Sequence, residues 1–523
     1  MSKNLSSLSY RAGNLADSSK KTFFRPSVEA GASSFYDFTN DENVHKKVHV
    51  CCGTVCMVSG TQEHVHGQLK EHFTPDEIGK VCCLGRCHEN GSFMYNNSNY
   101  SGEDIGKIAE IIKGENNLSI DRYHVQTLAR EVMLTPHSLD LSAMYQLAAA
   151  YTEKSHDLIA EMKTSQLRGR GGAGFPVSVK LESFALASAT DKYVVCNADE
   201  GDPGAFSDRY LLENQPHLVL FGMLVCGLAN RATEGILYIR HEYPEAVEKI
   251  SAAIAELKTY SPFPFRIVRG KGAYVCGEET ALINSIEEQR PEVRVRPPYP
   301  TIAGLYGKPT FLSNVETFAN MYWILKHGGE RYATYGSDKS RGNKLVCLDS
   351  CFNNPGVYEV EFGTPLTQIF SELGGGFTSP LKAMQIGGPL GGIVPLDKTG
   401  AMTLDFESLQ DQGFLMGHAG IVGIPEDFSM IRYIHHLLEF ARDESCGKCY
   451  PCRIGSQRAY ELVGNAIENN ENICFELLND ILWTMRKGSL CALGGGLPLP
   501  VNNALTYFNE ELSRHISYSG GRL

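Results

Sequence analysis

The chain has no apolar run long enough to cross a membrane and no excess of basic residues. Its longest apolar stretch, residues 217–229, is too short to span a bilayer and has a histidine at its edge. The net charge of -12 argues against a nucleic-acid-binding protein, because that function needs a basic surface. The first 21 residues lack the continuous apolar core of a secretory signal. We therefore expect a cytoplasmic protein that neither enters a membrane nor binds nucleic acid.

A length of 523 residues is too great for one hydrophobic core, and the composition, 42% hydrophobic and 21% charged, is typical of folded globular proteins. Strand and helix patterns alternate along most of the chain, so we expect an α/β multidomain protein. The N-terminal part, rich in Ser and Asn, is expected to be a mobile or loosely docked extension. The expected units are this extension, a small α/β unit, a larger α/β unit, a β-rich unit and a helical bundle, at residues 1–45, 46–117, 118–342, 343–425 and 426–523.

The 16 cysteines are the most informative feature of the sequence. Thiols in the cytosol stay reduced, so clustered cysteines there are more often metal ligands than disulfides. Cys446, Cys449 and Cys452 form a C-x2-C-x2-C run that suits three ligands of a [4Fe-4S] cluster. Cys491, in the glycine-rich loop "GSLCALGG", is the candidate for the fourth. Zinc is the alternative, although zinc sites usually show paired C-x2-C knuckles.

Two further cysteine loops, "VCCGTVC" and "VCCLGRC", follow predicted strands near the N-terminus. One pair from each loop could hold a [2Fe-2S] cluster, and the predicted ligands are Cys51, Cys56, Cys83 and Cys87. Cys52 and Cys82 are then spare, and the spacing alone also permits pairings that include them. A zinc site or a redox disulfide is the alternative to an iron-sulfur cluster here.

The glycine-rich loop "RGRGGAGFP", residues 168–176, does not match the GxGxxG dinucleotide fingerprint. Its four glycines still allow a flat or phosphate-bearing ligand to approach the backbone, and basic side chains lie nearby. The stretches at 196–209 and 272–282 each follow a predicted strand and carry several carboxylates. Acidic groups beside a nicotinamide nucleotide favour NAD(H), because they would repel a 2'-phosphate. These three segments together predict a nucleotide pocket.

The motifs "GRGGAGFP", "CNADE", "GAYVCGEETAL", "LSNVET" and "ESCGKCYPCR" occur in this order. From about residue 165 to 495 the chain resembles the NADH-binding flavoprotein subunit of respiratory complex I and its relatives. The relatives include the diaphorase subunits of NAD-reducing hydrogenases and of NAD-dependent molybdenum or tungsten formate dehydrogenases. The N-terminal unit resembles a thioredoxin-like [2Fe-2S] domain, and residues 343–425 resemble a β-grasp-like domain. The resemblance also implies a helical [4Fe-4S] domain at the C-terminus.

The resemblance implies a pocket for FMN and NAD(H) and no separate catalytic side chain, because hydride transfer is cofactor chemistry. The implied pocket residues are Gly169, Arg170, Gly171, Gly172, Phe175, Lys180, Asn197, Asp199, Glu200, Asp202, Tyr274, Gly277, Glu278, Glu279, Tyr299, Ser313, Asn314 and Thr317. Phe175 and Tyr299 would sandwich the nicotinamide or adenine ring. Two positions depart from the family pattern, with Asp202 in place of the usual Glu and Ser313 in place of the usual Asn.

The predicted function is that of a diaphorase subunit, which exchanges hydride between NAD(H) and FMN and passes single electrons through iron-sulfur clusters to a partner. The sequence contains no motif for oxidising formate or splitting hydrogen, so a catalytic large subunit is expected. Chain length, the fused N-terminal unit and the C-terminal sequence favour the β subunit of a formate dehydrogenase. A hydrogenase diaphorase is the second interpretation and a complex I subunit the third. The non-enzymatic alternative is a redox-sensing iron-sulfur scaffold.

Overall fold

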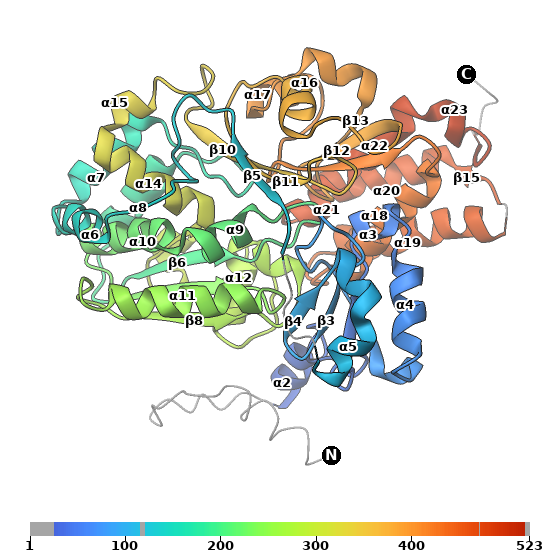
Figure 1. The fold of residues 1–523 in the computed structure, drawn as a ribbon, viewed down its shortest axis with the longest axis horizontal. Helices are drawn as coiled ribbons and strands as arrows, with labels where there is room; N and C mark the ends of the chain where they lie inside the picture. The colour runs from blue at the N-terminus through green and yellow to red at the C-terminus, as the bar shows by residue number, and fades with distance from the viewer. Residues whose placement is uncertain (1–25, 116–120, 470, 518–523) are drawn as a thin grey trace.

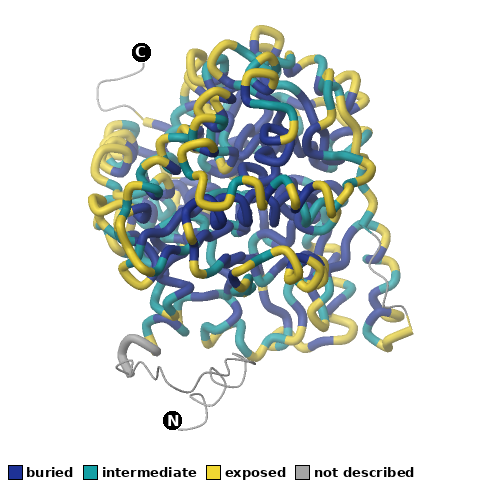
Figure 2. The backbone as a smooth tube through the Cα atoms, turned by 90° about the vertical axis from the view of Figure 1, so that its left-hand side faces the viewer, coloured by how far each residue is buried: buried dark blue, intermediate teal, exposed yellow. Residues whose placement is uncertain are grey.

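The computed structural model describes residues 26–115, 121–469 and 471–517. The N-terminal unit lies at the lower right of Figure 1, the larger α/β unit at the left, the β-rich unit at the top and the C-terminal helices at the right. Figure 2 shows buried backbone running continuously through the interior of these units, with exposed segments at the surface. The expected α/β class is confirmed, as a mixed α/β fold with several sheets.

The N-terminal unit has a four-stranded sheet in the order β2-β1-β3-β4. β1 pairs in parallel with β2 and antiparallel with β3. The helices α4 and α5 place Val65, Leu69 and Ile108 in one apolar cluster with Val48 and Val50 of β1. The elements are β1 (Val48–Cys51), α3 (Thr54–Val58), α4 (Gln62–Lys70), β2 (Ile78–Val81), β3 (Phe93–Tyr95), β4 (Ser98–Tyr100) and α5 (Ile108–Lys113).

The segment before β1 packs against the larger α/β unit, which differs from the expected loose extension. It begins with α2 (Pro26–Ser33). Tyr36 is 1% exposed, and its hydroxyl donates to Oγ of Ser285 at 2.9 Å. The backbone N–H of Asp37 donates to the carbonyl of Gly272 at 2.9 Å. Local composition does not reveal such a contact, because the partners come from distant parts of the chain. The expectation for residues 1–25 lies outside the described residues.

The larger α/β unit is built on four parallel strands in the order β8-β7-β6-β9. The central strands β6 and β7 are mostly buried, which explains their largely apolar sequences, whereas the edge strand β8 is half-buried. Val194 packs in one cluster with the long helices α10 and α14, while Val195 packs on the opposite face with α12 and Tyr36. The bounds are β6 (Tyr193–Ala198), β7 (Glu234–Ile239), β8 (Phe265–Arg269), β9 (Thr310–Asn314), α8 (Val177–Leu186), α9 (Ser207–Asn214), α10 (Pro216–Asn230), α11 (Pro244–Leu257), α12 (Glu279–Ile286) and α14 (Val315–His327).

The β-rich unit contains a six-stranded sheet in the order β13-β12-β14-β10-β11-β5. Its edge strand β5 belongs in sequence to the expected unit at 118–342, but it pairs in parallel with β11, with His124 opposite Gly356. The Glu359 carboxylate on β11 accepts the backbone N–H of Met133 and Leu134, which holds the following segment in place. The strands are β5 (His124–Thr127), β10 (Asn343–Leu348), β11 (Gly356–Glu361), β12 (Leu381–Ile386), β13 (Gly392–Pro395) and β14 (Gly420–Pro425).

The C-terminal part is helical, as predicted. α18 buries an apolar stripe that includes Ile434, Leu437, Leu438 and Ala441. This spacing is typical of an amphipathic helix that packs against a bundle. The helices are α18 (Met430–Asp443), α19 (Tyr450–Glu468), α20 (Phe475–Gly488), α21 (Ala492–Gly496) and α22 (Pro498–Tyr507).

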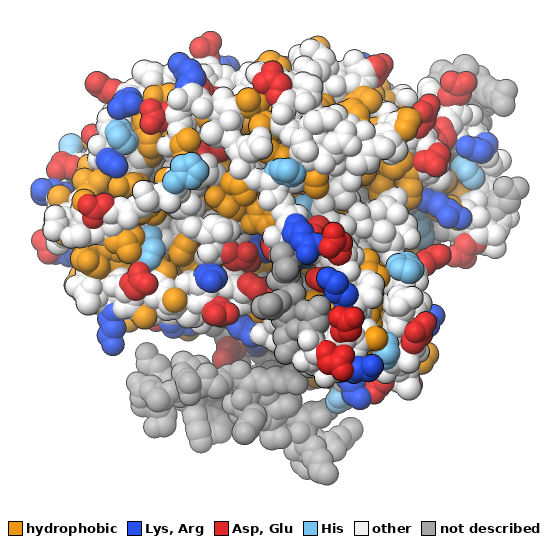
Figure 3. Space-filling model, viewed as in Figure 1, with side chains coloured by type: hydrophobic (Ala, Val, Ile, Leu, Met, Phe, Trp, Pro, Cys, Tyr) orange, Lys and Arg blue, Asp and Glu red, His pale blue; other side chains and the backbone are white. Residues whose placement is uncertain are grey.

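In the described part of the chain, no single helix is long and apolar enough to cross a membrane. α9 and α10 would meet the length and composition criteria only as a pair, and they are bent by 91° to each other. On the face shown in Figure 3, acidic and basic side chains are interspersed over the described residues.

Candidate functional site

Most predicted nucleotide-pocket residues meet at one edge of the parallel sheet, where β6, β8 and β9 end. Asn197, near the end of β6, donates from Nδ2 to the carbonyl of Gly277 at 2.9 Å and accepts the backbone N–H of Asp199 at 3.1 Å. A Cβ at Gly277 would lie 3.2 Å from the carbonyl oxygen of Asp199. The carboxyl edge of a parallel sheet is the usual place for a ligand in α/β proteins.

The glycine-rich loop lies directly over the start of α14. Its ends pair, because Gly169 donates its N–H to the carbonyl of Phe175 at 2.8 Å. Gly172 has a φ of +110°, which side chains with a Cβ rarely adopt, and a Cβ at Gly171 would lie 3.1 Å from Cβ of Asn314. The loop is thus a cradle free of side chains, which fits a flat or phosphate-bearing ligand.

The side chain of Arg170 points away from this cradle. The guanidinium is fully buried and donates to the hydroxyl of Tyr332 at 2.8 Å and to the carbonyl of Arg341 at 2.6 Å. The backbone N–H of Arg170 donates to Oγ1 of Thr317 at 2.9 Å, which ties the loop to α14. Arg170 therefore supports the loop, and only its backbone could meet a ligand.

Asn314 caps the N-terminus of α14. Its Oδ1 accepts the N–H groups of Glu316 and Thr317 at 2.9 and 3.3 Å, and its Nδ2 donates to Asp208 at 2.6 Å. One amide N–H of Asn314 is left for another partner. Ser313 precedes it at the end of β9 and is half-buried, as is Asn314.

Two acidic predicted residues begin α12, and they have different environments. Glu278 caps the helix by accepting the backbone N–H of Thr280 and Ala281, both at 2.9 Å. Glu279 forms ion pairs with Lys180 at 2.8 Å and Arg296 at 3.1 Å. Burial would raise the pKa of Glu279, but the two cations hold it below its usual value. The negative charge of Glu279 is therefore largely compensated by its neighbours.

Asp199 and Asp202 lie in the loop after β6. Oδ2 of Asp199 is sealed from solvent and has no hydrogen-bond partner among the described residues. An unpaired buried carboxylate oxygen is costly, so it fits a donor supplied by a ligand. Asp202 accepts a hydrogen bond from the hydroxyl of Tyr274 at 2.8 Å. Phe175 and Tyr299 are 53% and 56% exposed, so both rings are available at the surface for stacking.

Glu200 faces the protein interior and is 3% exposed. Its carboxylate accepts the backbone N–H of Asp208 at 3.0 Å and that of Arg209 at 3.2 Å, which caps the start of α9. His418 lies 3.4 Å from Glu200 and 3.3 Å from Asp208. The sequence prediction included Glu200 but missed Asp208 and His418. Asp208 lies in the stretch 196–209 that the sequence analysis singled out, whereas His418 comes from a distant loop without a motif.

The four cysteines predicted to hold a [4Fe-4S] cluster converge in the C-terminal helical part. Cys446 and Cys491 pack in one apolar cluster, and Cys449 and Cys491 both pack against the cluster that contains Cys452. Burial, with Cys449 and Cys446 nearby, raises the pKa of Cys452 to about 11, although Ser445 opposes this shift. The donor set is four thiols from two loops, as a cubane cluster requires.

The helices of this part position its thiols. Cys449 and Cys491 are the residues directly before α19 and α21. Helix N-termini favour negative charge, so they suit thiolate ligands. A Cβ at Gly494 would lie 2.6 Å from Cβ of Cys452, so this glycine permits the close approach of the two loops.

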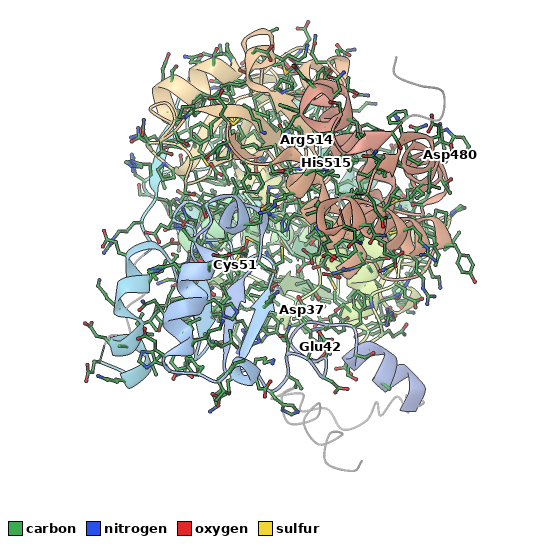
Figure 4. All side chains as sticks on the ribbon, turned by 90° about the vertical axis from the view of Figure 1, so that its right-hand side faces the viewer. Asp37, Glu42, Cys51, Asp480, Arg514 and His515 are labelled. Carbon is green, nitrogen blue, oxygen red and sulfur yellow. The ribbon has the colours of Figure 1, made fainter. Side chains whose placement is uncertain are left out.

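Four N-terminal cysteines also converge, and they are the four that were predicted. The Cys51 thiol has Cys56 and Cys83 as neighbours, and the Sγ atoms of Cys83 and Cys87 are 3.4 Å apart. All four are at most 2% exposed. Cys51 lies where the N-terminal unit meets the rest of the chain (Figure 4). Cys52 and Cys82 are neighbours of each other, and Cys51 of the group also lies near Cys82.

Comparisons with known proteins match two segments of the chain. Residues 162–323 match the family described as the Nuo51 FMN-binding domain, and residues 432–515 match the NADH-ubiquinone oxidoreductase-F iron-sulfur binding region. The NADP-reducing hydrogenase subunit HndC of Solidesulfovibrio fructosivorans is 38% identical over 73% of this chain and 81% of its own length. The mitochondrial NADH dehydrogenase [ubiquinone] flavoprotein 1 of Dictyostelium discoideum is 35% identical over 69% of this chain and 78% of its own length.

The chain belongs to the family of NADH-binding flavoprotein subunits of complex I and related hydrogenases. It is a subunit of an NAD(H)-dependent flavin iron-sulfur oxidoreductase, with an FMN and NAD(H) binding region and a [4Fe-4S] binding region. The recognition of this family from its motifs is confirmed.

Solved structures extend the likeness beyond these regions. A chain in the crystal structure of an NAD+-reducing [NiFe]-hydrogenase in the H2-reduced state has a TM-score of 0.86 and 27% identity, over 94% of this chain and 89% of its own. A chain of an NAD+-reducing [NiFe]-hydrogenase in the air-oxidized state has a TM-score of 0.85 and 26% identity, over 100% of this chain and 92% of its own. The second alignment includes the N-terminal unit, which the matched family segments do not cover.

Proposed function

We propose that the chain is the diaphorase subunit of a hydrogenase-type complex and carries both a [4Fe-4S] and a [2Fe-2S] cluster. The observation that carries the proposal is the alignment of the whole chain, N-terminal unit included, with a subunit of an NAD+-reducing [NiFe]-hydrogenase structure. The relative HndC is also a hydrogenase subunit. A formate dehydrogenase, favoured by sequence alone, is the alternative partner.

We assign the binding of FMN and NAD(H) to the carboxyl edge of the parallel sheet. Bound there, FMN supplies the exchange between hydride pairs and single electrons. The glycine cradle excludes side chains from the ligand surface, and Asn314 offers its remaining N–H. Oδ2 of Asp199 accepts a hydrogen bond from the ligand, which gives this buried oxygen a partner. Phe175 and Tyr299 cover ring faces of the nucleotide and limit the access of water.

The thiols of the C-terminal site are Cys446, Cys449, Cys452 and Cys491. Those of the N-terminal site are Cys51, Cys56, Cys83 and Cys87. We assign a thioredoxin-like fold to the N-terminal unit, supported by its mixed four-stranded sheet and flanking helices. For the β-rich unit we keep the β-grasp-like assignment as part of the proposal.

Exposed apolar side chains surround the loops that hold the C-terminal thiols. Tyr450, Ile454 and Leu490 are 77%, 51% and 40% exposed. Tyr450 and Ile454 are four residues apart on α19 and so share one face. An exposed apolar surface beside a cluster suits the docking of an electron-transfer partner. We assign this surface to the contact with the partner.

Purification of the native complex tests the assignment of the partner. The large subunit that co-purifies with the chain is identified, and its metal is measured. Nickel together with hydrogen-dependent NAD reduction supports the proposal. Molybdenum or tungsten with formate-dependent reduction favours the alternative. If the isolated chain oxidised hydrogen or formate by itself, both assignments of a catalytic partner would be contradicted. The chain would then contain a catalytic site of its own.

A further inference from the structure

Cys52 and Cys82 face each other at the ends of two neighbouring parallel strands. The register of β1 and β2 pairs Cys51 with Val81, and the backbone N–H of Cys52 donates to the carbonyl of Val81 at 2.9 Å. Cys52 and Cys82 are the residues directly after these two strands. Neighbouring strands lie about 4.8 Å apart. This spacing is within the Cα separation of disulfides, about 4.4 to 6.8 Å.

The side chains of the two residues are neighbours. The Cys52 side chain lies beside the chain segment that carries Cys82, since its Sγ donates to the carbonyl oxygen of Val81, the residue before Cys82, at 3.4 Å. Both residues are partly exposed, whereas the four cysteines assigned to the N-terminal cluster are fully buried. The pair therefore differs from the assigned cluster cysteines in exposure, and Cys51 is also a neighbour of Cys82.

We propose that Cys52 and Cys82 form a redox-active dithiol, which hydrogen peroxide converts reversibly to a disulfide beside the N-terminal cluster site. The inference rests on the proposed function only in assigning the other four cysteines to that cluster. It adds an oxidant-sensing modification site that electron transfer itself does not require.

The reaction is balanced in two steps. One thiol ionises, and its thiolate attacks an oxygen of hydrogen peroxide; the O–O bond breaks, a sulfenic acid is formed, and the leaving hydroxide takes up the released proton to give one water. The second thiol then attacks the sulfenic sulfur, so that the S–S bond forms and a second water leaves. Two thiols lose two electrons in total, and one peroxide is reduced to two waters. A dithiol reductant such as thioredoxin reverses the change by thiol-disulfide exchange.

Closure would affect the cluster because each cysteine of the pair adjoins a ligand. Cys51 precedes Cys52 and Cys83 follows Cys82 in the chain. A bond between the two strand ends fixes the backbone that carries both of these ligands. Oxidation of the pair therefore constrains the positions of two proposed cluster ligands, Cys51 and Cys83.

The test uses the full chain with its iron-sulfur clusters, treated anaerobically with an equimolar amount of hydrogen peroxide and then with a thiol-blocking reagent. Trypsin separates the two loops, since it cuts after Lys70, Lys80 and Arg86. Mass spectrometry should find fragments 48–70 and 81–86 linked, with the linked form rising about tenfold over the untreated protein. Fragmentation should locate the link at Cys52 and Cys82.

Variants separate this proposal from the cluster assignment. Cys52→Ser and Cys82→Ser should each abolish the link and keep the paramagnetic signal of the N-terminal cluster. Cys474→Ser, at a partly exposed cysteine of the helical part, is the matched control and should keep both. The proposal is overturned if no link forms, if the link joins Cys51 or Cys83, or if Cys52→Ser loses the cluster signal. The link is measured without NADH, so a failure of the proposed function in electron transfer gives a different result.

Discussion

The backbone N–H of Gly204 donates a hydrogen bond to Sγ of Cys87 at 3.2 Å. Gly204 belongs to the loop that carries Asp199 and Asp202 of the proposed nucleotide site, so this loop touches a proposed cluster ligand directly. The backbone N–H of Ser350 also donates to the carbonyl of Cys87 at 3.0 Å. Hydrogen bonds to ligand sulfurs are among the factors that set the potential of iron-sulfur clusters. The N-terminal unit is thus docked through its ligand loop.

Replacing Cys449 with Ala should separate flavin reduction from electron delivery. The residue lies before α19, in the C-terminal thiol group and outside the nucleotide pocket. NADH should still bleach the flavin absorbance at close to the normal rate, while reduction of the partner should fall by about a hundredfold or more. Stopped-flow absorbance measures both steps. Cys474→Ser is the control, and a loss of flavin reduction in Cys449→Ala alone would argue against the order of the two steps.

Replacing Glu279 with Gln should improve the use of NADPH. Glu279 pairs with Lys180 and Arg296, and its loss would free two cations to meet a 2'-phosphate. We expect kcat/KM for NADPH to rise about tenfold, or about 1.4 kcal/mol, with a smaller change for NADH. Steady-state kinetics with an artificial acceptor measures this. Glu287→Gln, just after the far end of α12, should leave the preference unchanged; an unchanged preference in Glu279→Gln would remove this residue from cofactor selection.

Replacing Lys344 with Met should destabilise the contact between α14 and β10. Lys344 and Glu316 form an ion pair with both side chains fully buried, and Glu316 also accepts the backbone N–H of Leu345 at 3.1 Å. Removing one partner leaves a buried charge, at a cost of about 3 to 5 kcal/mol. Urea unfolding followed by fluorescence measures the loss.

Two controls accompany this variant. Lys344→Met with Glu316→Gln should recover part of the stability, because no isolated charge remains. Lys382→Met breaks a more exposed pair with Glu511 and should cost about 1 kcal/mol or less. Equal losses in the two single Lys→Met variants would contradict the role given to burial.

Stability should decline on the alkaline side because of His418. Burial would lower the pKa of His418, but Asp208 and Glu200 outweigh it and raise the pKa to about 9, while Lys344 opposes them slightly. The group binds its proton more tightly in the folded state. Its contribution is therefore complete below the unfolded pKa of 6.5 and is lost as the pH rises through about 9.

Thermal melting between pH 6 and 10 measures this contribution. The melting temperature of the unmodified chain should fall more steeply above pH 7 than that of His418→Gln, with a difference of at most about 1.4 kcal/mol per pH unit. His156→Gln, at an exposed histidine, should follow the unmodified chain. Parallel curves for the unmodified chain and His418→Gln would count against a charged His418.

The two groups of cluster cysteines could be predicted from sequence because most of their cysteines lie close together in short loops. Cys446, Cys449 and Cys452 lie within seven residues, and local spacing largely determines their convergence. The strand patterns likewise predicted β6, β7 and β8, and the buried strands β6 and β7 have the largely apolar sequences typical of parallel sheets.

Contacts between residues that are far apart in the sequence could not be predicted. The proximity of Cys52 and Cys82 follows from the register of β1 and β2, which spacing does not encode. Tyr36 bonds to Ser285 across 249 residues of sequence. Glu200 belongs to a motif that implied a ligand contact, but its carboxylate turns inward because the start of α9 needs a cap.

We propose that one chain combines a flavin and NAD(H) site with two iron-sulfur clusters. The most direct measurement is iron analysis with electron paramagnetic resonance of the holoprotein after anaerobic reduction by NADH and then dithionite. We predict about six iron atoms per chain, four from one cluster and two from the other, and two distinct signals. Cys449→Ala should alter one signal and Cys51→Ser the other. Zinc in either thiol group, or a single signal that both variants abolish, would contradict the account.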